Sequence, residues 1–349
     1  MDQPQQHDED GGGRIHTGTI TPKARASMHL EGQDVTTSLD QAASTFVEVR
    51  PRLFGIAYRM LGGVAEAEDI VQETWLRWQN TERSVIADPA AFLALITTRL
   101  SINAAQSARA RRETYIGPWL PEPVDTSADP ALGAERGEAL ELALLLLLEK
   151  LTPAQRAAYI LREAFVYPYE QIAEIIQMSP ANVRQLVSRA RKHLNTARRG
   201  SIDTGEHRRL LTAFLDAAQA GNVRALEDLF AADVVSSSDG NGIRGAARFP
   251  LTGTARVARF VAAVAAKHWS DGDITWVEVN GRAGVLVPSG RTGVVLLTID
   301  ASPEGVHHLM WIVSPDKLDG FVRSAERGDL RFPTPSPSPR NTGITSSRA

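Results

Sequence analysis

The stretch from Tyr169 to Leu194 constrains the fold most strongly, because it predicts two short helices joined by a tight turn. Ser179 can cap the second helix through its hydroxyl group, and Pro180 suits the first helical position, where no backbone donor is needed. Apolar residues then recur at helical spacing and should pack inward, namely Val183, Leu186, Val187, Ala190 and Leu194. A tight helix pair with a basic second helix is typical of a helix-turn-helix that enters the major groove of DNA.

The outward face of the predicted second helix suits DNA. No acidic residue occurs from Ile175 through Ile202, whereas six arginine and lysine residues do. The expected outward residues are of the types that contact bases and phosphates: Ala181, Asn182, Arg184, Gln185, Ser188, Arg189, Arg191 and Lys192. A solvated basic helix in an ordinary bundle would show the same periodicity, so that alternative stays open on the pattern alone.

Length and composition limit which domains, metal sites and membrane segments the chain can have. A chain of 349 residues is long enough for two or three domains, and its net charge of −3 does not argue against DNA, because the basic residues are locally clustered. The absence of cysteine excludes disulfides, thiolate zinc sites and cysteine nucleophiles, and it fits a reducing cytoplasm. No apolar run reaches the roughly 18 residues that span a bilayer. We expect a cytoplasmic protein with no membrane segment, no metal and no cofactor.

Blocks of different composition indicate the domain organisation. Residues 1–38 have few large apolar side chains and residues 332–349 are rich in proline, so both ends are expected to be disordered. Helical periodicity fills 39–116 and 131–200, joined by a proline-bearing connector at 117–130. Over 206–331, helical segments give way to short β-branched runs at 274–279, 284–287, 292–299 and 306–313. We therefore predict a multidomain protein with two all-α domains followed by an α+β domain.

The segment from Ala65 to Gln79 predicts a helix with two different faces. One face is largely apolar and consists of Ala67, Ile70, Val71, Thr74, Trp75 and Trp78. The other consists of Asp69, Gln72, Glu73 and Leu76. Carboxylates, an amide and one leucine form a plausible docking surface for a basic or amphipathic helix of a partner. A solvated acidic face is the commoner explanation of such a pattern taken alone.

A further amphipathic helix is predicted from Asp88 to Arg112, and it ends in a basic run without acidic residues. Its cationic side chains suit phosphates, and its short polar side chains suit base edges or an unstacked base. The cationic residues are Arg99, Arg109, Arg111 and Arg112, and the polar ones include Asn103. Tyr115 and Trp119 could add stacking surfaces or could belong to a core.

Taken in order and spacing, three segments resemble the bacterial sigma factors of the extracytoplasmic-function (ECF) type, within the sigma-70 family. Residues 52–78 are similar to the sigma-2 segment that docks on the clamp helices of core RNA polymerase, which implies that Asp69, Gln72, Glu73 and Leu76 contact polymerase. Residues 99–112 resemble the part of sigma-2 that melts the promoter and reads its −10 element, with Asn103-Ala104-Ala105 standing where the family commonly shows an Asp and a Leu-Arg pair. The residues implied there are Arg99, Asn103, Arg109, Arg111 and Arg112.

Residues 151–194 are similar to the sigma-4 domain, whose recognition helix reads the −35 element. Thr152, Pro153 and Gln155 form a capping box on its leading helix. The resemblance implies DNA contacts by Ser179, Ala181, Asn182, Arg184, Gln185, Ser188, Arg189, Arg191 and Lys192. The expected partners are thus core RNA polymerase and promoter DNA.

The connector resembles that of one subgroup of these sigma factors, because it contains Trp-Leu-Pro-Glu-Pro at 119–123. That subgroup carries a C-terminal SnoaL-like domain of the NTF2-like cone fold, and it is also marked by Asp-Gly-Gly-Gly-Lys and Asn-Pro-Asp-Lys-Leu segments. Residues 239–243 and 314–318 are similar to these, with Asn241 replacing a glycine and Ile243, beside Arg244, replacing the lysine. The resemblance implies a built-in regulator whose interface comprises Trp119, Leu120, Pro121, Glu122, Pro123, Asp239, Arg244, Asp316 and Lys317.

The role of the C-terminal domain leaves alternatives open, because a cone of this kind can hold an active site, a ligand or only an interface. Asp239, Asp273 and Asp300 could each act as a general base, but no acid and base pair stands out, so we expect no catalysis. His307 and His308 are adjacent and should point to opposite faces of a strand, where they cannot chelate one ion together. A small-molecule ligand in the cone and a homodimer through this domain stay open.

Two other functions compete with a sigma factor. A one-component transcription regulator would join the helix-turn-helix to a ligand-binding NTF2-like domain, but it leaves the docking surface of residues 69–76 without a purpose. A cyclase-like or isomerase enzyme with an N-terminal extension would need a polar catalytic pair inside the cone.

Overall fold

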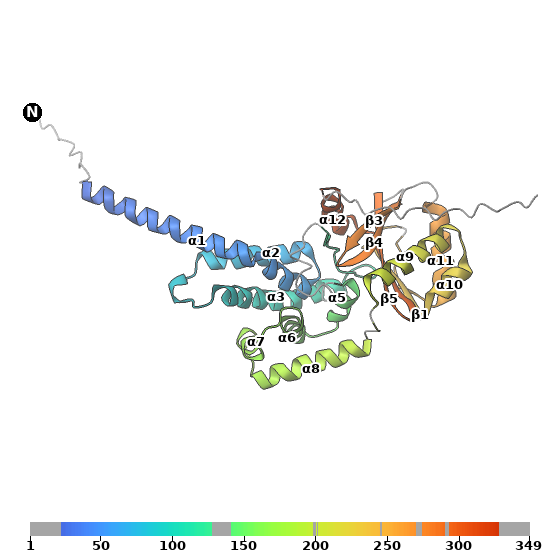
Figure 1. The fold of residues 1–349 in the computed structure, drawn as a ribbon, viewed down its shortest axis with the longest axis horizontal. Coiled ribbons are helices and arrows are strands. Elements are labelled where there is room, and N and C mark those ends of the chain that lie inside the picture. Colours follow the sequence, from blue (N-terminus) through green and yellow to red (C-terminus); the bar gives the residue numbers. More distant parts are fainter. Residues whose placement is uncertain are drawn as a thin grey trace, which may run out of the picture.

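The computed structural model describes residues 22–127, 141–197, 200, 202–244, 246–269, 274–289 and 293–327. The first domain is built from long helices, shown at the blue end of the chain in Figure 1. These are α1 (Pro22–Leu61), α2 (Val64–Gln79), the short 3₁₀ helix η1 (Arg83–Val85) and α3 (Pro89–Glu113). Large side chains that include Leu53, Tyr58 and Trp78 are fully buried where α1, α2 and α3 meet.

Helix α1 begins earlier than the sequence pattern indicates. The expectation of disorder for residues 1–38 is wrong for residues 22–38, which are helical. Elongating an existing helix adds one hydrogen bond for each residue fixed, without a new nucleation step, so a segment with few large apolar residues can continue it. The expectations for residues 1–21 and 332–349 lie outside the described residues.

The second domain contains the predicted helix-turn-helix. Its helices are α5 (Leu142–Leu148), α6 (Pro153–Glu163), α7 (Tyr169–Ile176) and α8 (Pro180–Ala197). The capping box on α6 is confirmed. The backbone N–H of Gln155 donates to Thr152 Oγ1, and the backbone N–H of Thr152 donates to Gln155 Oε1. Helix α7 ends at Gln177 in the left-handed conformation with φ of 56°. The Asn182 amide then donates to Ser179 Oγ at 3.3 Å, so the expected cap of α8 is present.

The third domain is α+β, as predicted. Its helices are α9 (Thr204–Gln219), α10 (Val223–Leu229), α11 (Thr254–His268) and α12 (Pro315–Arg327). Its strands are β1 (Phe230–Asp239), β2 (Leu251–Thr252), β3 (Thr275–Val279), β4 (Arg282–Ser289), β5 (Gly293–Ser302) and β6 (Gly305–Ile312). They form one sheet in the order β2-β1-β6-β5-β4-β3, in which only β1 and β6 run parallel.

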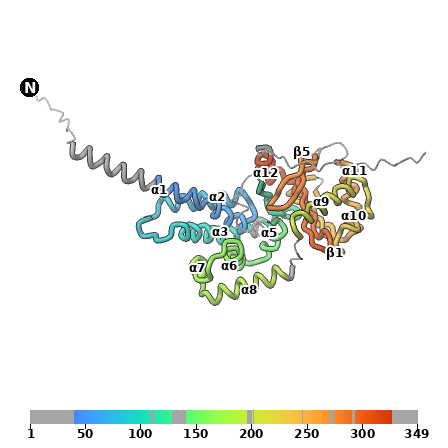
Figure 2. The backbone as a smooth tube through the Cα atoms, viewed as in Figure 1, coloured from blue at the N-terminus to red at the C-terminus, as the bar shows by residue number. Residues whose placement is uncertain are grey.

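The two faces of this sheet belong to different cores. Leu309 and Trp311 of β6 pack with α9, α10 and α11, whereas the alternate residues Met310 and Ile312 join the apolar cluster of the helical domains. The sheet is therefore packed directly against the helical half of the molecule, and Figure 2 shows the chain passing between them along the connector. Within the described residues, no helix has the length and apolarity that crossing a membrane requires.

Candidate polymerase, promoter and interdomain contacts

The predicted docking residues lie together on the outer side of α2. Ala67, Val71, Thr74 and Trp78 are buried on the opposite face, as expected from the periodicity. Asp69 and Gln72 are exposed, and the side chain of Leu76 is 47% exposed although it is apolar. Glu73 is partly buried and accepts a hydrogen bond of 2.8 Å from Arg77 Nε. An exposed leucine among acidic and amide groups is the chemistry expected where a partner helix docks.

Helix α8 presents its basic face to solvent. Its inward residues are buried, with Leu186 partly so, and every predicted outward residue is exposed: Ala181, Asn182, Arg184, Gln185, Ser188, Arg189, Arg191 and Lys192. Arg184 lies 2.9 Å from Glu170, and Arg191 lies 2.6 Å from Glu163. The hydrogen bond to Glu163 raises the pKa of Arg191. Both pairs are substantially exposed, so exchanging them for phosphate contacts costs little.

Unlike the residues of α8, the residues predicted to read the −10 element are not all exposed to solvent. Asn103 is exposed on α3. Arg99 instead donates from Nε to the Ile175 carbonyl at 2.9 Å and from Nη2 to the Glu174 carbonyl at 3.0 Å. It thus holds the last turn of α7 against α3. The side chains of Arg109 and Arg111 lie outside those that the structure describes.

Arg112 is likewise occupied within the protein. Its guanidinium lies 3.6 Å from the centroid of the Trp119 ring and pairs with Glu149, which also accepts from Arg156 at 2.6 Å. The same guanidinium donates to the Leu61 carbonyl. In this conformation, Arg99 and Arg112 therefore join the two helical domains and are not available to phosphates.

Asp239 is the centre of the contact between the connector and the C-terminal domain. Its side chain is completely buried at the end of β1. Oδ1 accepts from the Tyr115 hydroxyl, and Oδ2 accepts from the Leu120 amide at 2.7 Å and from Lys317 Nζ at 2.6 Å. Burial, together with the bond to Asp239, raises the pKa of Tyr115 above its usual range. A buried carboxylate needs hydrogen-bond donors, and the three donors here fix the position of the connector against β1.

Lys317, at the start of α12, completes this contact. Its Nζ also donates to the Leu120 carbonyl and lies 4.6 Å from the centroid of the Trp119 ring. Burial lowers the pKa of Lys317, while Asp239 opposes that shift. Trp119 thereby links Lys317 of the C-terminal domain to Arg112 of the first domain, and Arg112 links onward to Glu149 of the second. We call these residues, with Tyr115, Leu120 and Asp239, the connector clasp.

The remaining residues of the predicted regulatory interface have separate positions. Pro121 and Pro123 are buried, and Glu122 Oε2 accepts from the Val64 amide at 2.8 Å at the start of α2. Burial raises the pKa of Glu122. Arg244 and Asp316 are exposed. Seven of the nine predicted residues thus lie in the connector contact, whereas Arg244 and Asp316 are at the surface.

A second contact joins the connector to the turn between β3 and β4. Asn280, which has φ of 53° and is buried, donates to the Tyr58 hydroxyl at 2.8 Å, and its Oδ1 accepts from the Val124 amide at 3.0 Å. Tyr58 in turn donates to the Glu122 carbonyl at 2.6 Å. Thr126 Oγ1 donates to Glu278 Oε1 at 2.6 Å. The Asn280-Gly281 dipeptide between two β-branched runs indicates a tight hairpin turn in the sequence, but it does not indicate these partners.

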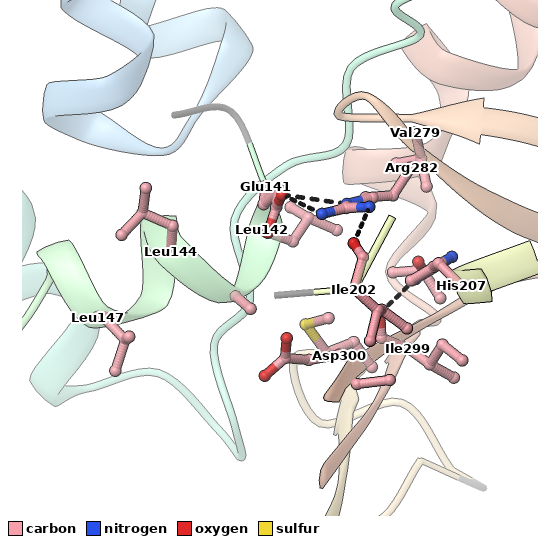
Figure 3. Close-up of a pocket in the computed structure, with 14 residues that line it drawn as sticks. Glu141, Leu142, Leu144, Leu147, Ile202, His207, Val279, Arg282, Ile299 and Asp300 are labelled. Carbon is pink, nitrogen blue, oxygen red and sulfur yellow. Dashed lines mark hydrogen bonds and ion pairs between the residues drawn. The ribbon is translucent and has the colours of Figure 1, made fainter. Parts of the chain in front are cut away.

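A third contact joins α5 to the sheet and is drawn in Figure 3. Arg282 donates to Glu141 Oε1 from Nε at 3.0 Å and from Nη2 at 2.7 Å, and to the Ile202 carbonyl from Nη1 at 3.1 Å. A cavity of about 50 Å³ lies beside this pair and is also lined by His207 and Asp300. Sequence reasoning missed both Glu141 and Arg282, because nothing in their local pattern distinguishes them from surface charges.

The acids considered as general bases have different surroundings in the described residues. Asp239 is saturated with donors inside the clasp, and Asp300 borders the 50 Å³ cavity. Asp273 lies outside the described residues. His307 contacts Asp233 and Ser302, whereas His308 contacts Ser237, so the two histidines have different neighbours.

Comparisons with known proteins agree with this architecture. Residues 45–111 match the family described as Sigma-70 region 2, and residues 141–194 match Sigma-70, region 4. The chain is 36% identical over 293 residues to the ECF RNA polymerase sigma factor SigJ of Mycobacterium tuberculosis, a match covering 79% of this chain and 93% of that protein. It is 32% identical over 288 residues to the probable ECF RNA polymerase sigma factor SigI of the same species, covering 80% and 96% respectively. The crystal structure of SigJ matches with a TM-score of 0.67 at 34% identity, covering 80% of this chain and 98% of that one.

Proposed function

The chain belongs to the extracytoplasmic-function sigma factors of the sigma-70 family, and from this premise we propose that it binds core RNA polymerase through α2 and directs it to a two-part promoter. The observation that carries the proposal is the exposed set of Asp69, Gln72 and Leu76 on α2, in the same chain as the exposed basic face of α8. A regulator that bound only DNA would need α8 but not the α2 surface. The protein would act in the cytoplasm, where transcription takes place.

In this structure the two helical domains are joined too closely to reach both elements of such a promoter. Elements centred near −35 and −10 are separated by roughly 25 base pairs, or about 85 Å along B-form DNA. Arg99 of α3 nevertheless bonds directly to the last turn of α7, which immediately precedes α8. The surfaces proposed to read the two elements therefore lie on α3 and α8, which both pack against α6 and α7 (Figure 1). We infer that the two helical domains must separate before both elements can be read by one molecule.

The C-terminal domain is well placed to control that separation. It fixes the connector through Asp239, Asn280 and Lys317, and it fixes α5 of the second helical domain through Arg282. Because the clasp contacts the connector and both helical domains, its loss would weaken the closed arrangement as a whole. We propose that the domain is a built-in regulator that favours the closed form.

Binding of core RNA polymerase tests the first part of the proposal. We expect the variant Gln72→Ala with Leu76→Ala to co-purify with mycobacterial core polymerase much less than the intact protein does. The matched control is Arg224→Ala with Asp228→Ala, which removes two exposed side chains of α10. Lys317→Ala is included because the closed form could mask α2. If neither the intact protein nor Lys317→Ala bound core polymerase, the proposed function would be wrong.

Transcription from a cognate promoter tests the regulatory part. Lys317→Ala should change transcript yield severalfold, whereas Arg323→Ala, at an exposed position of the same helix, should not. Point substitution is preferable to removing the whole domain, because removal would uncover the apolar cluster that Met310 and Ile312 share with the helical domains. Equal yields from Lys317→Ala, Arg323→Ala and the intact protein would argue against regulation through the clasp.

A further inference from the structure

The C-terminal domain contains a cavity that none of the interdomain contacts uses. Its volume is about 400 Å³, and it lies between α11 and the strands β4, β5 and β6. The walls are mainly apolar, with contributions from Phe260, Val264, Trp269, Val295 and Trp311. This volume is within the usual range of about 300 to 1,000 Å³ for pockets that enclose small ligands. The cavity on the other face of the sheet, beside Arg282, is only about 50 Å³.

The polar groups of this larger cavity favour an anion. Lys267 and His268, in the last turn of α11, line it together with Arg244, and no acidic side chain is among its described lining residues. Lys267 and His268 form no ion pair with any residue that the structure describes. Cations at a helix C-terminus also stabilise the helix dipole, but that role does not require an adjoining apolar chamber.

A hydroxyl group inside the cavity supports the same conclusion. Ser238 is 5% exposed and lines the cavity. The neighbouring serines of β1 are satisfied, since Ser236 accepts from Trp311 Nε1 at 2.9 Å and Ser237 bonds His308 at 2.9 Å. A hydroxyl group that lines a cavity can donate to or accept from a ligand there.

We propose that this cavity binds a small apolar molecule that carries one anionic group. The apolar body would pack among Phe260, Trp269 and Trp311, while the anionic group would lie near Lys267 and His268. The site goes beyond the proposed sigma-factor function and does not depend on it, because its walls belong to the C-terminal domain alone.

Two fluorescent probes that differ by one charge test the proposal in the full-length protein. 1-Anilinonaphthalene-8-sulfonate carries a sulfonate, and N-phenyl-1-naphthylamine has the same rings without it. We expect saturable binding of one equivalent of the sulfonate probe. Reversing one charge at the rim with Lys267→Glu should weaken that binding by about fivefold or more, while leaving the uncharged probe nearly unaffected. The control Arg259→Glu makes the same charge change at an exposed position of α11 outside the cavity.

A cavity-filling variant tests the location. Val264→Trp should abolish binding of both probes, with its circular dichroism and urea midpoint confirming that it folds. Ser238→Ala provides a second, smaller change that should weaken only the sulfonate probe. The proposal is overturned if the intact protein binds neither probe, if folded Val264→Trp binds both unchanged, or if Lys267→Glu and Arg259→Glu have equal effects.

Discussion

At the level of single residues, the clasp depends on one buried ion pair. Lys317 Nζ lies 2.6 Å from Asp239 Oδ2, and the side chains are 14% and 0% exposed. Removing one partner of a buried pair leaves the other charge unpaired, at a cost of about 3 to 5 kcal/mol. We therefore expect Asp239→Asn and Lys317→Met each to lower the free energy of unfolding by several kcal/mol in urea titrations. The double variant should lose clearly less than the sum of the two losses, and strict additivity would contradict the proposed coupling.

His207, which is buried, and His308, which is partly buried, should make stability depend on pH. Burial, with a smaller contribution from Lys150, lowers the pKa of His308 from 6.5 to about 4, and burial also lowers the pKa of His207. Between pH 6.5 and about 4 the unfolded chain binds a proton at residue 308 that the folded protein does not. Stability is thus fully present above pH 6.5 and falls as the pH drops toward 4, by up to about 3 kcal/mol for His308.

The measurement is the urea midpoint at a series of pH values. His308→Gln should flatten the decline without abolishing it, because His207 still titrates. A decline that is equally steep in the variant would show that His308 is not responsible.

At the level of elements, the sequence predicts the helices with two distinct faces but not the strand at the centre of the clasp. Periodicity places the buried and exposed sides of α2 and α8 correctly, because each of these helices buries one stripe against its own domain. The ten residues of β1 include Asp233 and a run of three serines, which have low β-propensity. Its pairing with β6, roughly seventy residues later in the chain, overrides that propensity.

In the candidate site, too, the sequence identifies some of the contacting residues and not others. Resemblance to a sigma subgroup identifies Trp119, Asp239 and Lys317, and the structure brings these three together. Tyr58, Asn280 and Glu141 could not be predicted, because their partners come from other domains and their local sequence carries no signal. Arg99 and Arg112 are predicted as DNA contacts from their charge and from the resemblance to sigma-2, and neither shows that carbonyls and Glu149 already occupy them here.

Arg184 on α8 is expected to read a base of the −35 element. Arg184 is exposed and, among the residues that the structure describes, is held by Glu170 and the Tyr169 ring, so it can turn to a base edge at little cost. Arg184→Ala should weaken binding to an intact −35 element by about 1 to 3 kcal/mol and leave binding to a scrambled element nearly unchanged. Gel-shift titrations at fixed salt measure both. An equal loss on the two DNAs would make Arg184 a phosphate contact.

At the level of the whole molecule, the C-terminal sheet and the helical domains share one apolar cluster, and the connector is fixed along most of its described length. Such an arrangement opens as a unit, because loosening one contact exposes apolar surface in the others. It keeps α3 packed against α6 and α7, the helices on which α8 lies, whereas promoter elements about 85 Å apart require α3 and α8 to separate.

Energy transfer between α3 and α8 tests this central claim most directly. The chain has no cysteine, so Gln106→Cys with Asn195→Cys gives two unique, exposed labelling positions outside the predicted DNA contacts. We predict high transfer efficiency in the free protein, an intermediate value in Lys317→Ala, and a value near zero in the complex with core polymerase and a two-element promoter. High transfer that persists in a complex in which both elements are protected from cleavage would contradict the account.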